Sequence, residues 1–175
     1  MRKVIVALAA SADGFIAAKG GDMEWLTSRP KPAGFYGMGE FMKTVDAKVF
    51  GRKTYEEGLK LGGKPNPKDP WLVFSRSLKQ ADVPAGVEIV SEPVGAFVKR
   101  LREKPGKNIW LMGGGDLIAS FLDANAIDEF IISVNPVFLG EGVPLIARRH
   151  RETALTLVST QSFEDGVVQL RYTVR

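Results

Sequence analysis

The sequence predicts an α/β fold: a three-layer α/β/α sandwich with a mostly parallel central sheet and an antiparallel C-terminal edge. Two patterns lead to this class. Apolar runs of strand length alternate with helical patterns along most of the chain, and the last forty residues hold strand patterns without a long helix. A length of 175 residues is typical of one domain, so we expect a single domain over residues 1–175.

The first half of the chain predicts short strands and one short helix. Residues 3–9 are an apolar run too short for a signal peptide, so we interpret them as a buried strand. A helix is expected to begin near Tyr36 and to end at residues 41–44. Pro and Gly gather at residues 29–39 and 62–70, which we interpret as surface loops. Further strands are predicted at residues 47–50, 71–74 and 87–90.

The second half of the chain carries the clearest helical pattern. Its apolar positions recur at helical spacing from Val94 to Leu101, Pro93 suits the first turn, and Gly106 follows the last one. Residues 117–122 carry a second apolar helical face. Strands are predicted at residues 108–112, 129–134, 155–158 and 167–174, the last two as an antiparallel pair turning near Asp165 and Gly166.

The composition excludes several classes of site. There are no cysteines, which removes disulfides, zinc–thiolate centres, iron–sulfur clusters and a cysteine nucleophile. The single histidine, His150, is too few for a metal site built on histidine, so we expect no metal. No stretch approaches the ~20 apolar residues of a membrane span. We therefore expect a cytoplasmic protein without membrane contact.

The formal net charge of +4 has two explanations. One is a solvated basic surface, and the other is attraction of an anionic ligand such as a phosphorylated cofactor. The basic residues are spread along the chain, and the tight cluster is Arg148-Arg149-His150-Arg151. We therefore expect a small-molecule substrate and no nucleic-acid partner.

Ligands of open α/β sheets bind outside the carboxyl ends of the strands, so the residues after each predicted strand are the candidate site. The strand at 108–112 is followed by Gly113-Gly114-Gly115 and then by Asp116 and Leu117 at a helix start. Glycine lets a backbone approach a phosphate closely, and a helix N-terminus offers free N–H groups with partial positive charge. A tight turn with Asp116 as a first-turn acid explains the same residues.

Two more strand ends carry groups suited to an anion. The segment Gly51-Arg52-Lys53-Thr54 offers two cations and a hydroxyl at a helix start, and Ser75 and Arg76 follow the strand at 71–74. A solvated helix start and a Ser-rich turn are the alternatives. Three such ends in one sheet favour a single ligand that carries several phosphates.

The order and spacing of these segments resemble the dihydrofolate reductase superfamily, including the reductase domain of riboflavin biosynthesis. The resemblance covers essentially the whole chain, and residues 137–145 resemble the riboflavin-type reductases in particular. The zinc deaminase domain that often accompanies that reductase is missing, so the chain is similar to the standalone branch. The four matching motifs are Ala12-Asp13-Gly14-Phe15-Ile16, Gly51-Arg52-Lys53-Thr54-Tyr55-Glu56, Phe74-Ser75-Arg76-Ser77 and Met112-Gly113-Gly114-Gly115.

The resemblance implies a dihydrofolate reductase-like fold and NADPH as the cofactor. It implies that residues 52–54 and 113–117 hold the pyrophosphate side, with a cis peptide bond at Gly113–Gly114, and that Ser75 and Arg76 bind the 2′-phosphate. The loop at Asp13 would close beside the nicotinamide. The implied cofactor-binding residues are Gly14, Ile16, Gly51, Arg52, Lys53, Thr54, Ser75, Arg76, Gly113, Gly114, Gly115, Asp116 and Leu117.

The substrate half departs from the dihydrofolate reductases. Those enzymes carry a substrate-binding carboxylate on the helix before the Gly-Arg-x-Thr motif, and counting back from Gly51 places Phe35 there. The nearest acid is Glu40, which counts against folate as the substrate. The residues that the resemblance implies for the substrate are Trp25, which matches a loop tryptophan, Thr27 of the riboflavin-type segment Trp25-Leu26-Thr27-Ser28, and Ser133, which matches a hydroxyl near the pterin.

The sequence therefore predicts an NADPH-dependent reductase. It would transfer a hydride to a C=N carbon of a small heterocyclic or ribosylamino-pyrimidine substrate, as a 5-amino-6-(5-phosphoribosylamino)uracil reductase does. The proton would come from water or from a carboxylate, and Asp13 and Glu40 are the candidate catalytic residues. Asp13 as a turn former and Glu40 as a solvated helix acid are the alternatives. A true dihydrofolate reductase and a non-catalytic NADPH-binding module stay open, and an exposed sheet edge would allow a homodimer.

Overall fold

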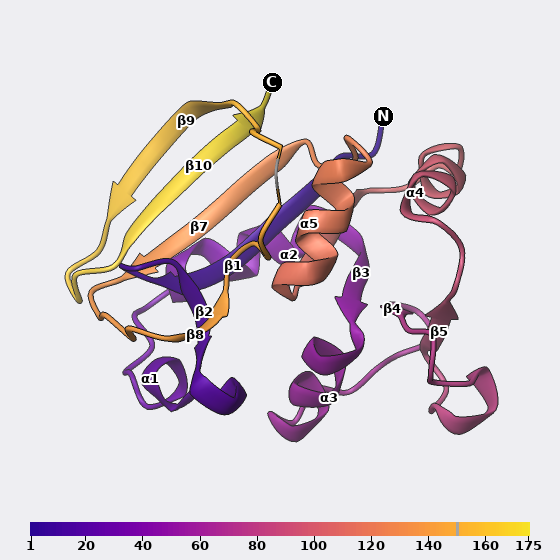
Figure 1. Ribbon diagram of the computed structural model, residues 1–175, viewed down its shortest axis with the longest axis horizontal. Coiled ribbons are helices and arrows are strands. Elements are labelled where there is room, and N and C mark those ends of the chain that lie inside the picture. Colours follow the sequence, from indigo (N-terminus) through magenta and orange to yellow (C-terminus); the bar gives the residue numbers. More distant parts are fainter. Residues whose placement is uncertain (150) are drawn as a thin grey trace.

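The computed structural model describes residues 1–149 and 151–175, so His150, on which the histidine argument rests, lies outside the described residues. An eight-stranded sheet runs in the order β5-β4-β3-β6-β1-β7-β10-β9 (Figure 1). Its strands are β1 (Val4–Ser11), β3 (Val45–Gly51), β4 (Trp71–Phe74), β5 (Val87–Val90), β6 (Asn108–Gly113), β7 (Glu129–Asn135), β9 (Leu155–Ser162) and β10 (Val168–Val174).

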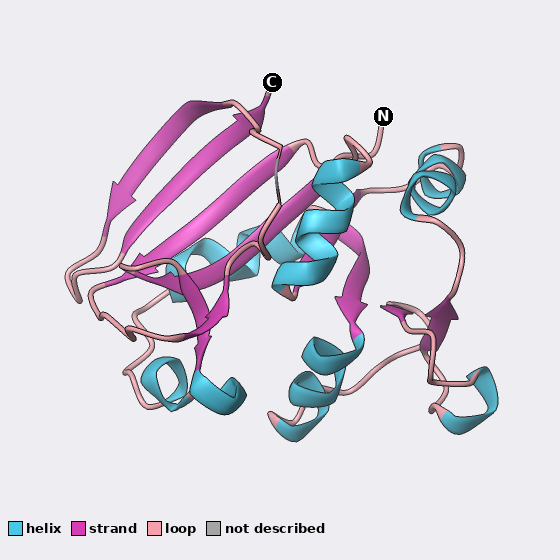
Figure 2. Cartoon of the chain, viewed as in Figure 1, coloured by secondary structure: helices cyan, strands magenta, loops and turns pink. Residues whose placement is uncertain are grey.

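Helices connect most of these strands (Figure 2). The α-helices are α1 (Glu24–Thr27), α2 (Met38–Lys43), α3 (Arg52–Lys60), α4 (Val94–Arg102) and α5 (Gly115–Asp123), and the short 3₁₀ turns are η1 (Lys19–Gly21), η2 (Phe35–Gly37) and η3 (Gln80–Asp82). A separate two-stranded ribbon consists of β2 (Phe15–Ala18) and β8 (Gly142–Pro144).

The strands from β5 to β7 are parallel, and β10 and β9 complete the sheet as an antiparallel pair. Val6 of β1 lies beside Leu111 of β6 on one side and Phe130 of β7 on the other. Buried apolar residues therefore meet across the middle of the sheet, as expected for parallel strands covered on both faces. The predicted mostly parallel sheet with an antiparallel C-terminal edge is confirmed.

Alternation along the strands sends side chains into cores on opposite faces of the sheet. Val4 and Val6 of β1 pack in the core that includes Phe121 of α5. Ala7 packs in another core with Trp110 of β6, whose ring meets Phe41 of α2 edge-on at 5.3 Å between ring centroids. Helix α5 thus lies in front of the sheet and α2 behind it (Figure 1).

The element boundaries differ from the predicted ones by one or two residues at several strand and helix ends, and more clearly in three places. Helix α2 begins at Met38 because Tyr36 and Gly37 take left-handed backbone angles, φ 55° and 77°, which interrupt a right-handed helix. Strand β9 extends to Ser162, although its polar second half carries no apolar alternation. The β2–β8 ribbon and α1 were not predicted, because they are three or four residues long and β2 pairs with a segment far along the chain.

Candidate functional site

A cleft of about 1990 Å³ is lined in large part by residues at the carboxyl ends of the parallel strands. These strand ends lie on the lower side of the sheet in Figure 1. The lining of the cleft includes Arg76 and Val90 near β4 and β5 and Ser133 and Gln169 on β7 and β10, and it continues along the sheet to Lys3, Asn108 and Glu129, where β1, β6 and β7 begin. Small-molecule pockets measure about 300–1,000 Å³, so this cleft has room for two ligands or for one long one. Its position agrees with the rule that open α/β sheets bind ligands outside their carboxyl strand ends.

Two strand-to-helix turns meet at the centre of the cleft. A Cβ atom on Gly51 would lie 3.6 Å from the carbonyl oxygen of Gly113 and from the nitrogen of Gly114. A Cβ atom on Gly114 would lie 3.4 Å from Thr54 Oγ1. The starts of α3 and α5 therefore face each other across backbone that carries no side chain, which we call the glycine cradle (Gly51, Gly113, Gly114). The Gly113–Gly114 peptide bond is cis, as the resemblance implies.

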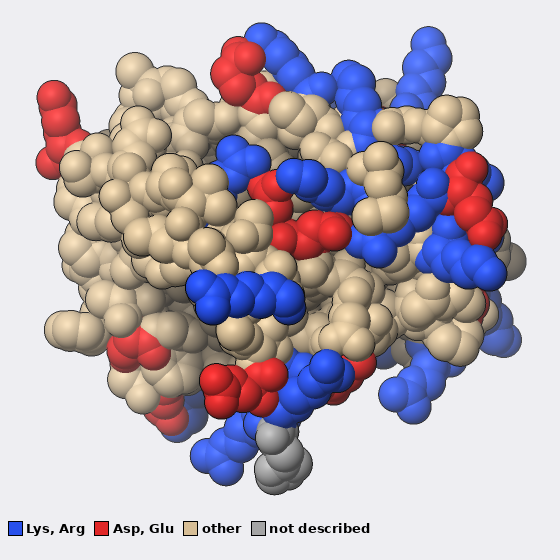
Figure 3. All heavy atoms as spheres, turned by 90° about the horizontal axis from the view of Figure 1, so that it is seen from above, with Lys and Arg blue, Asp and Glu red and all other residues tan. Residues whose placement is uncertain are grey.

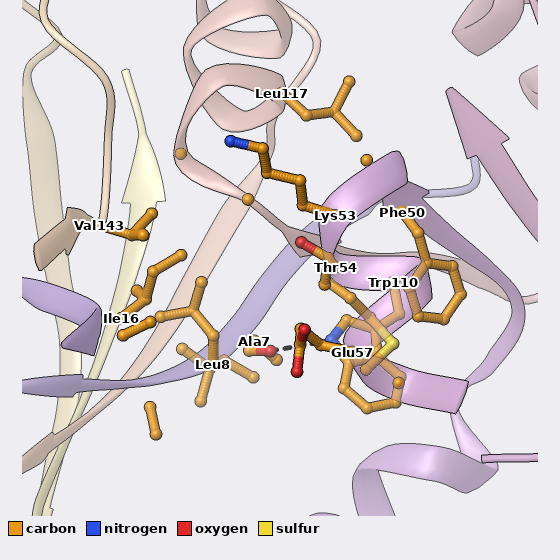
Figure 4. A pocket seen from close by; sticks show the side chains of 18 of the residues that line it. Ala7, Leu8, Ile16, Phe50, Lys53, Thr54, Glu57, Trp110, Leu117 and Val143 are labelled. Carbon is orange, nitrogen blue, oxygen red and sulfur yellow. Dashed lines mark hydrogen bonds between the residues drawn. The ribbon is translucent and has the colours of Figure 1, made fainter. Parts of the chain in front are cut away.

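Cationic and hydroxyl groups surround the glycine cradle. Figure 4 shows Lys53 extending beside Thr54 toward the N-terminal end of α5. Leu117 lies on the first turn of that helix, and Asp116 lines the cleft next to it. Two orphan N–H donors and the helix dipole at α5, together with the Lys53 ammonium, make this part of the cleft suited to an anion.

The third strand end, after β4, is a turn held by hydrogen bonds to the Ser75 side chain, and it carries the exposed cation Arg76. The hydroxyl of Ser75 accepts hydrogen bonds from the backbone N–H groups of Ser77 and Leu78, at 3.2 and 3.0 Å. Arg52 donates from Nη1 to the Ser77 hydroxyl at 2.8 Å, which joins this turn to the start of α3. Arg76 is exposed at the cleft, and among the described residues its guanidinium has no hydrogen-bond or ion-pair partner.

Asp13 fastens the loop after β1 to the loop that follows the neighbouring strand, β7. Its carboxylate accepts hydrogen bonds from the Ser11 hydroxyl at 2.6 Å and from the backbone N–H groups of Leu139 and Gly140, at 3.1 and 2.7 Å. The Ser11 hydroxyl and these N–H groups hold the pKa of Asp13 below its ordinary value, against the effect of desolvation. Asp13 does not line the cleft. These contacts fit a turn-forming anchor and not a proton donor.

Gly14 follows with φ 87°, which suits glycine, and its carbonyl accepts from Leu145 N–H at 2.9 Å. This bond continues the pairing of β2 with β8. Ile16 of β2 and Val143 of β8 then project into the cleft beside each other (Figure 4). The Gly14 backbone therefore shapes the loop, while Ile16 is the cleft-lining member of that motif.

The three residues expected at the substrate have different surroundings. Ser133 lines the cleft, and its hydroxyl accepts from Gln169 Nε2 at 3.3 Å. Thr27 also lines it, with its hydroxyl bonded to the Met23 carbonyl at 3.2 Å. Trp25 does not line the cleft, and its buried Nε1 has no hydrogen-bond partner among the described residues.

The acid expected on α2, Glu40, lies at the outer rim of the cleft. Its side chain is 81% exposed and its Oε1 is 2.6 Å from Lys43 Nζ. The structure instead brings a different carboxylate, Glu57 of α3, into the cleft, where it points toward the wall made by Ala7 and Trp110 (Figure 4). Glu57 follows Thr54 by three residues and Lys53 by four, so it lies on the same face of α3. That spacing was a sequence signal for Glu57.

The opposite side of the molecule, where β1, β3 and β7 begin, carries charges of both signs (Figure 3). Lys and Arg gather there on the side of α4, but acids accompany them. Arg100 pairs with Glu92 and Arg102 with Asp128, each at 2.6 Å. Among the described residues, no helix is long and apolar enough to cross a membrane, and no three acidic, His or Cys residues gather as a metal site.

Comparisons with known proteins agree with this geometry. The uncharacterized protein YyaP of Bacillus subtilis (strain 168) is 35% identical over 98% of this chain and 94% of its own length. A Shewanella sp. PV-4 crystal structure, described as a riboflavin biosynthesis protein, is 31% identical with a TM-score of 0.83, and covers 99% of both chains. Dihydrofolate reductase of Enterococcus faecalis, complexed with NADP(H), shares the fold at 18% identity with a TM-score of 0.68, over 99% of this chain and 96% of its own.

A family model decides the affiliation. The RibD C-terminal domain matches residues 2–169, which includes every strand end of the cleft and the ribbon beside it. The matched range thus contains the glycine cradle and most of the residues that line the cleft. The chain belongs to the RibD C-terminal domain family.

Proposed function

We propose that residues 1–175 act as one NADPH-dependent reductase domain, which transfers a hydride to a C=N carbon of a small heterocycle. The substrate class we propose is a ribosylamino-pyrimidine of the 5-amino-6-(5-phosphoribosylamino)uracil type. The observation that carries the proposal is the glycine cradle, with Lys53 and Thr54 directed at it. The RibD family and the Shewanella relative support the reductase class.

The residues of the cradle fit the phosphates of a dinucleotide. Gly114 leaves open the space beside Thr54 Oγ1 that a side chain would fill. Lys53 and the N-terminal end of α5 supply positive charge at the same place. The dihydrofolate reductase that shares this fold is complexed with NADP(H), which supports the same ligand here. Only NADPH carries a 2′-phosphate, and the free guanidinium of Arg76 suits that group.

A bound reduced nicotinamide would supply the hydride with both of its electrons. The chain's own residues supply position and a surrounding with little water. Leu8, Ile16 and Val143 line the middle of the cleft with apolar side chains (Figure 4). Trp110 donates from Nε1 to the carbonyl of Ala7 at 2.9 Å, which fixes the indole as a wall for a flat ring.

A true dihydrofolate reductase is the second candidate, favoured by the shared fold. The position expected to carry the substrate-binding acid holds Phe35. This residue lies in η2 and is 41% exposed. An apolar ring cannot accept hydrogen bonds from a pterin. We therefore propose the ribosylamino-pyrimidine, and not dihydrofolate, as the first candidate substrate.

The cofactor is tested by equilibrium binding, followed through the fluorescence of the reduced nicotinamide. The expected result is tight binding of NADPH and much weaker binding of NADH. The variant Arg76→Ala should weaken NADPH roughly 10- to 100-fold, which corresponds to the loss of a charge-assisted contact, with little change for NADH. Arg175→Ala, at the exposed C-terminal end, is the matched control. Equal losses of NADPH and NADH affinity would show that Arg76 does not bind the 2′-phosphate.

The reaction is tested by NADPH oxidation with each substrate in turn. Turnover with the ribosylamino-pyrimidine and none with dihydrofolate is the expected result. The reverse preference would identify a dihydrofolate reductase. Binding of NADPH without turnover of either compound would favour the non-catalytic binding module over the enzyme.

A further inference from the structure

We infer that Glu57 is the specificity-determining carboxylate of the substrate half, where it accepts hydrogen bonds from paired N–H groups on the edge of a nitrogen heterocycle. This inference rests on the proposed function, because the substrate half has meaning only beside a cofactor half. It assigns recognition to α3, which follows β3, and not to the helix before that strand.

The first argument is the direction of the α3 side chains. Lys53 and Thr54 point to the glycine cradle, while Glu57 points to the wall of Ala7 and Trp110 (Figure 4). Glu57 lies about one helical turn farther from the N-terminal end of α3, roughly 5 Å along the axis. One helix face therefore presents a cation and a hydroxyl to one half of the cleft and a carboxylate to the other.

The second argument is electrostatic. A carboxylate repels a phosphate, so Glu57 disfavours an anionic group at its end of the cleft, whereas Lys53 favours one at the cradle. Oε1 of Glu57 is 2.5 Å from Lys60 Nζ, whose side chain is 70% exposed. A carboxylate has about four acceptor positions, so this solvent-side contact leaves room for N–H donors from a ligand.

The third argument compares Glu57 with the other acids that line the cleft. Asp116 lies in the first turn of α5, on the cofactor side, while Glu92 pairs with Arg100 and Glu141 with Lys19. Glu129 is buried between Lys3 and Arg171, which occupy both of its oxygens at 2.5 and 2.6 Å. Glu56 pairs with Arg52 at 3.2 Å on the cofactor side. Glu40 has a lysine neighbour like that of Glu57, but its side chain is 81% exposed, against 41% for Glu57. Glu57 is the carboxylate that these contacts leave facing the substrate wall.

The wall opposite Glu57 adds shape without adding donors. The indole N–H of Trp110 is already bonded to the Ala7 carbonyl at 2.9 Å, so the small part of this residue that the core leaves exposed, 8%, offers no free N–H to the cleft. Phe50 and Leu8 extend this apolar lining (Figure 4). A flat ring with its N–H edge toward Glu57 satisfies both the wall and the carboxylate.

The probe for this site is 2,4-diaminopyrimidine, whose ring-protonated form presents a ring N–H beside an amino N–H, and 2,4-dimethoxypyrimidine is its partner without amino donors. Binding is measured by calorimetry in the presence of NADPH. The unmodified protein should prefer the diamino compound at least tenfold. Glu57→Gln should lose this preference, and Glu57→Asp should keep part of it. Glu103→Gln, which changes the exposed acid directly after α4 that pairs with Lys99, should leave it unchanged.

The NADPH dissociation constant and the melting temperature of each variant complete the test. Glu57→Gln should change NADPH affinity less than twofold, and its melting temperature should equal that of the unmodified protein. An equal loss of NADPH and probe binding would overturn the inference, because it would place Glu57 in the cofactor half. Equal binding of both pyrimidines to the unmodified protein would overturn it too. Failure of NADPH itself to bind would instead overturn the proposed function, and the pyrimidine preference could still be measured without it.

Discussion

The neighbouring glycines Gly114 and Gly115 should respond to the same substitution in opposite ways. A Cβ atom on Gly115 would lie 2.5 Å from the carbonyl oxygen of Pro144 and 3.2 Å from the nitrogen of Ala147. Both contacts are to backbone, so the segment after β8 must move. On Gly114 the nearest atom to a new Cβ is Thr54 Oγ1 at 3.4 Å, which is an ordinary contact. Gly115→Ala is therefore a packing variant and Gly114→Ala a ligand-site variant.

The magnitudes follow from these contacts. Forcing a methyl group into a packed site costs about 1–3 kcal/mol of unfolding free energy. For a chain of this length each kcal/mol lowers the melting temperature by about 2–4 °C, so Gly115→Ala should melt about 2–12 °C lower. Gly114→Ala should melt within about 2 °C of the unmodified protein. Its methyl group occupies the cradle, so NADPH binding should weaken at least tenfold, about 1.4 kcal/mol.

Calorimetric melting and NADPH fluorescence titration measure the two effects on the same preparations. Gly115→Ala should keep its NADPH affinity within a few-fold at a temperature where it is folded. Unchanged NADPH affinity in Gly114→Ala would refute the reasoning, because a phosphate seated against that backbone cannot share its place with a methyl group. Unchanged melting in Gly115→Ala would show that the segment after β8 yields without cost.

Three further predictions concern the loop, the buried acid and the sheet edge. Asp13→Asn should lower turnover and leave NADPH binding nearly intact, because an amide cannot accept all the N–H groups of Leu139 and Gly140; a change in kcat smaller than twofold would contradict this. Burial opposes ionisation of Glu129, but Lys3 and Arg171 outweigh it and lower its pKa from the ordinary 4.5, so its stabilisation is present above pH 4.5 and is lost as the pH falls through the folded pKa. Glu129→Gln should destabilise the protein by about 1–3 kcal/mol at neutral pH, with a difference that shrinks in acid melts; a difference that is constant with pH would contradict it. The homodimer stays a prediction, based on β9, an edge strand whose eight residues are all exposed. Light scattering should give twice the chain mass of 19.1 kDa for the unmodified protein and the single chain mass for Leu157→Lys.

The ends of a strand could be predicted where polar or turn residues directly follow its apolar run. Trp71–Phe74 and Val87–Val90 match the predicted runs at both ends, because polar or turn residues follow each of them. The helix at Val94–Arg102 matches because its apolar residues follow the helical period and bury Phe97, Val98 and Leu101. The β2–β8 ribbon was missed, since Ala17 and Val143 are neighbours only through the fold.

The two halves of the candidate site differ in the same way. The glycine cradle and its cations stand directly after predicted strands, and the carboxyl ends of parallel strands meet at one edge, so sequence order alone implied that they converge. The substrate wall combines Ala7, Glu57, Trp110 and Ser133 from four elements. Whether each side chain enters the cleft depends on which face of its strand or helix is covered.

The sequence by itself determined the fold class and the family resemblance, and it named the strand-end residues that we propose for the cofactor, because these depend on local periodicity and on short motifs at strand ends. Only the tertiary structure decided where the carboxylates lie and which groups they contact. It fastened Asp13 to the distant N–H groups of Leu139 and Gly140, left Glu40 at the solvent-exposed rim, and turned Glu57 toward Trp110. The physical reason is that a carboxylate is defined by the partners around it, and those partners come together only when the chain is folded.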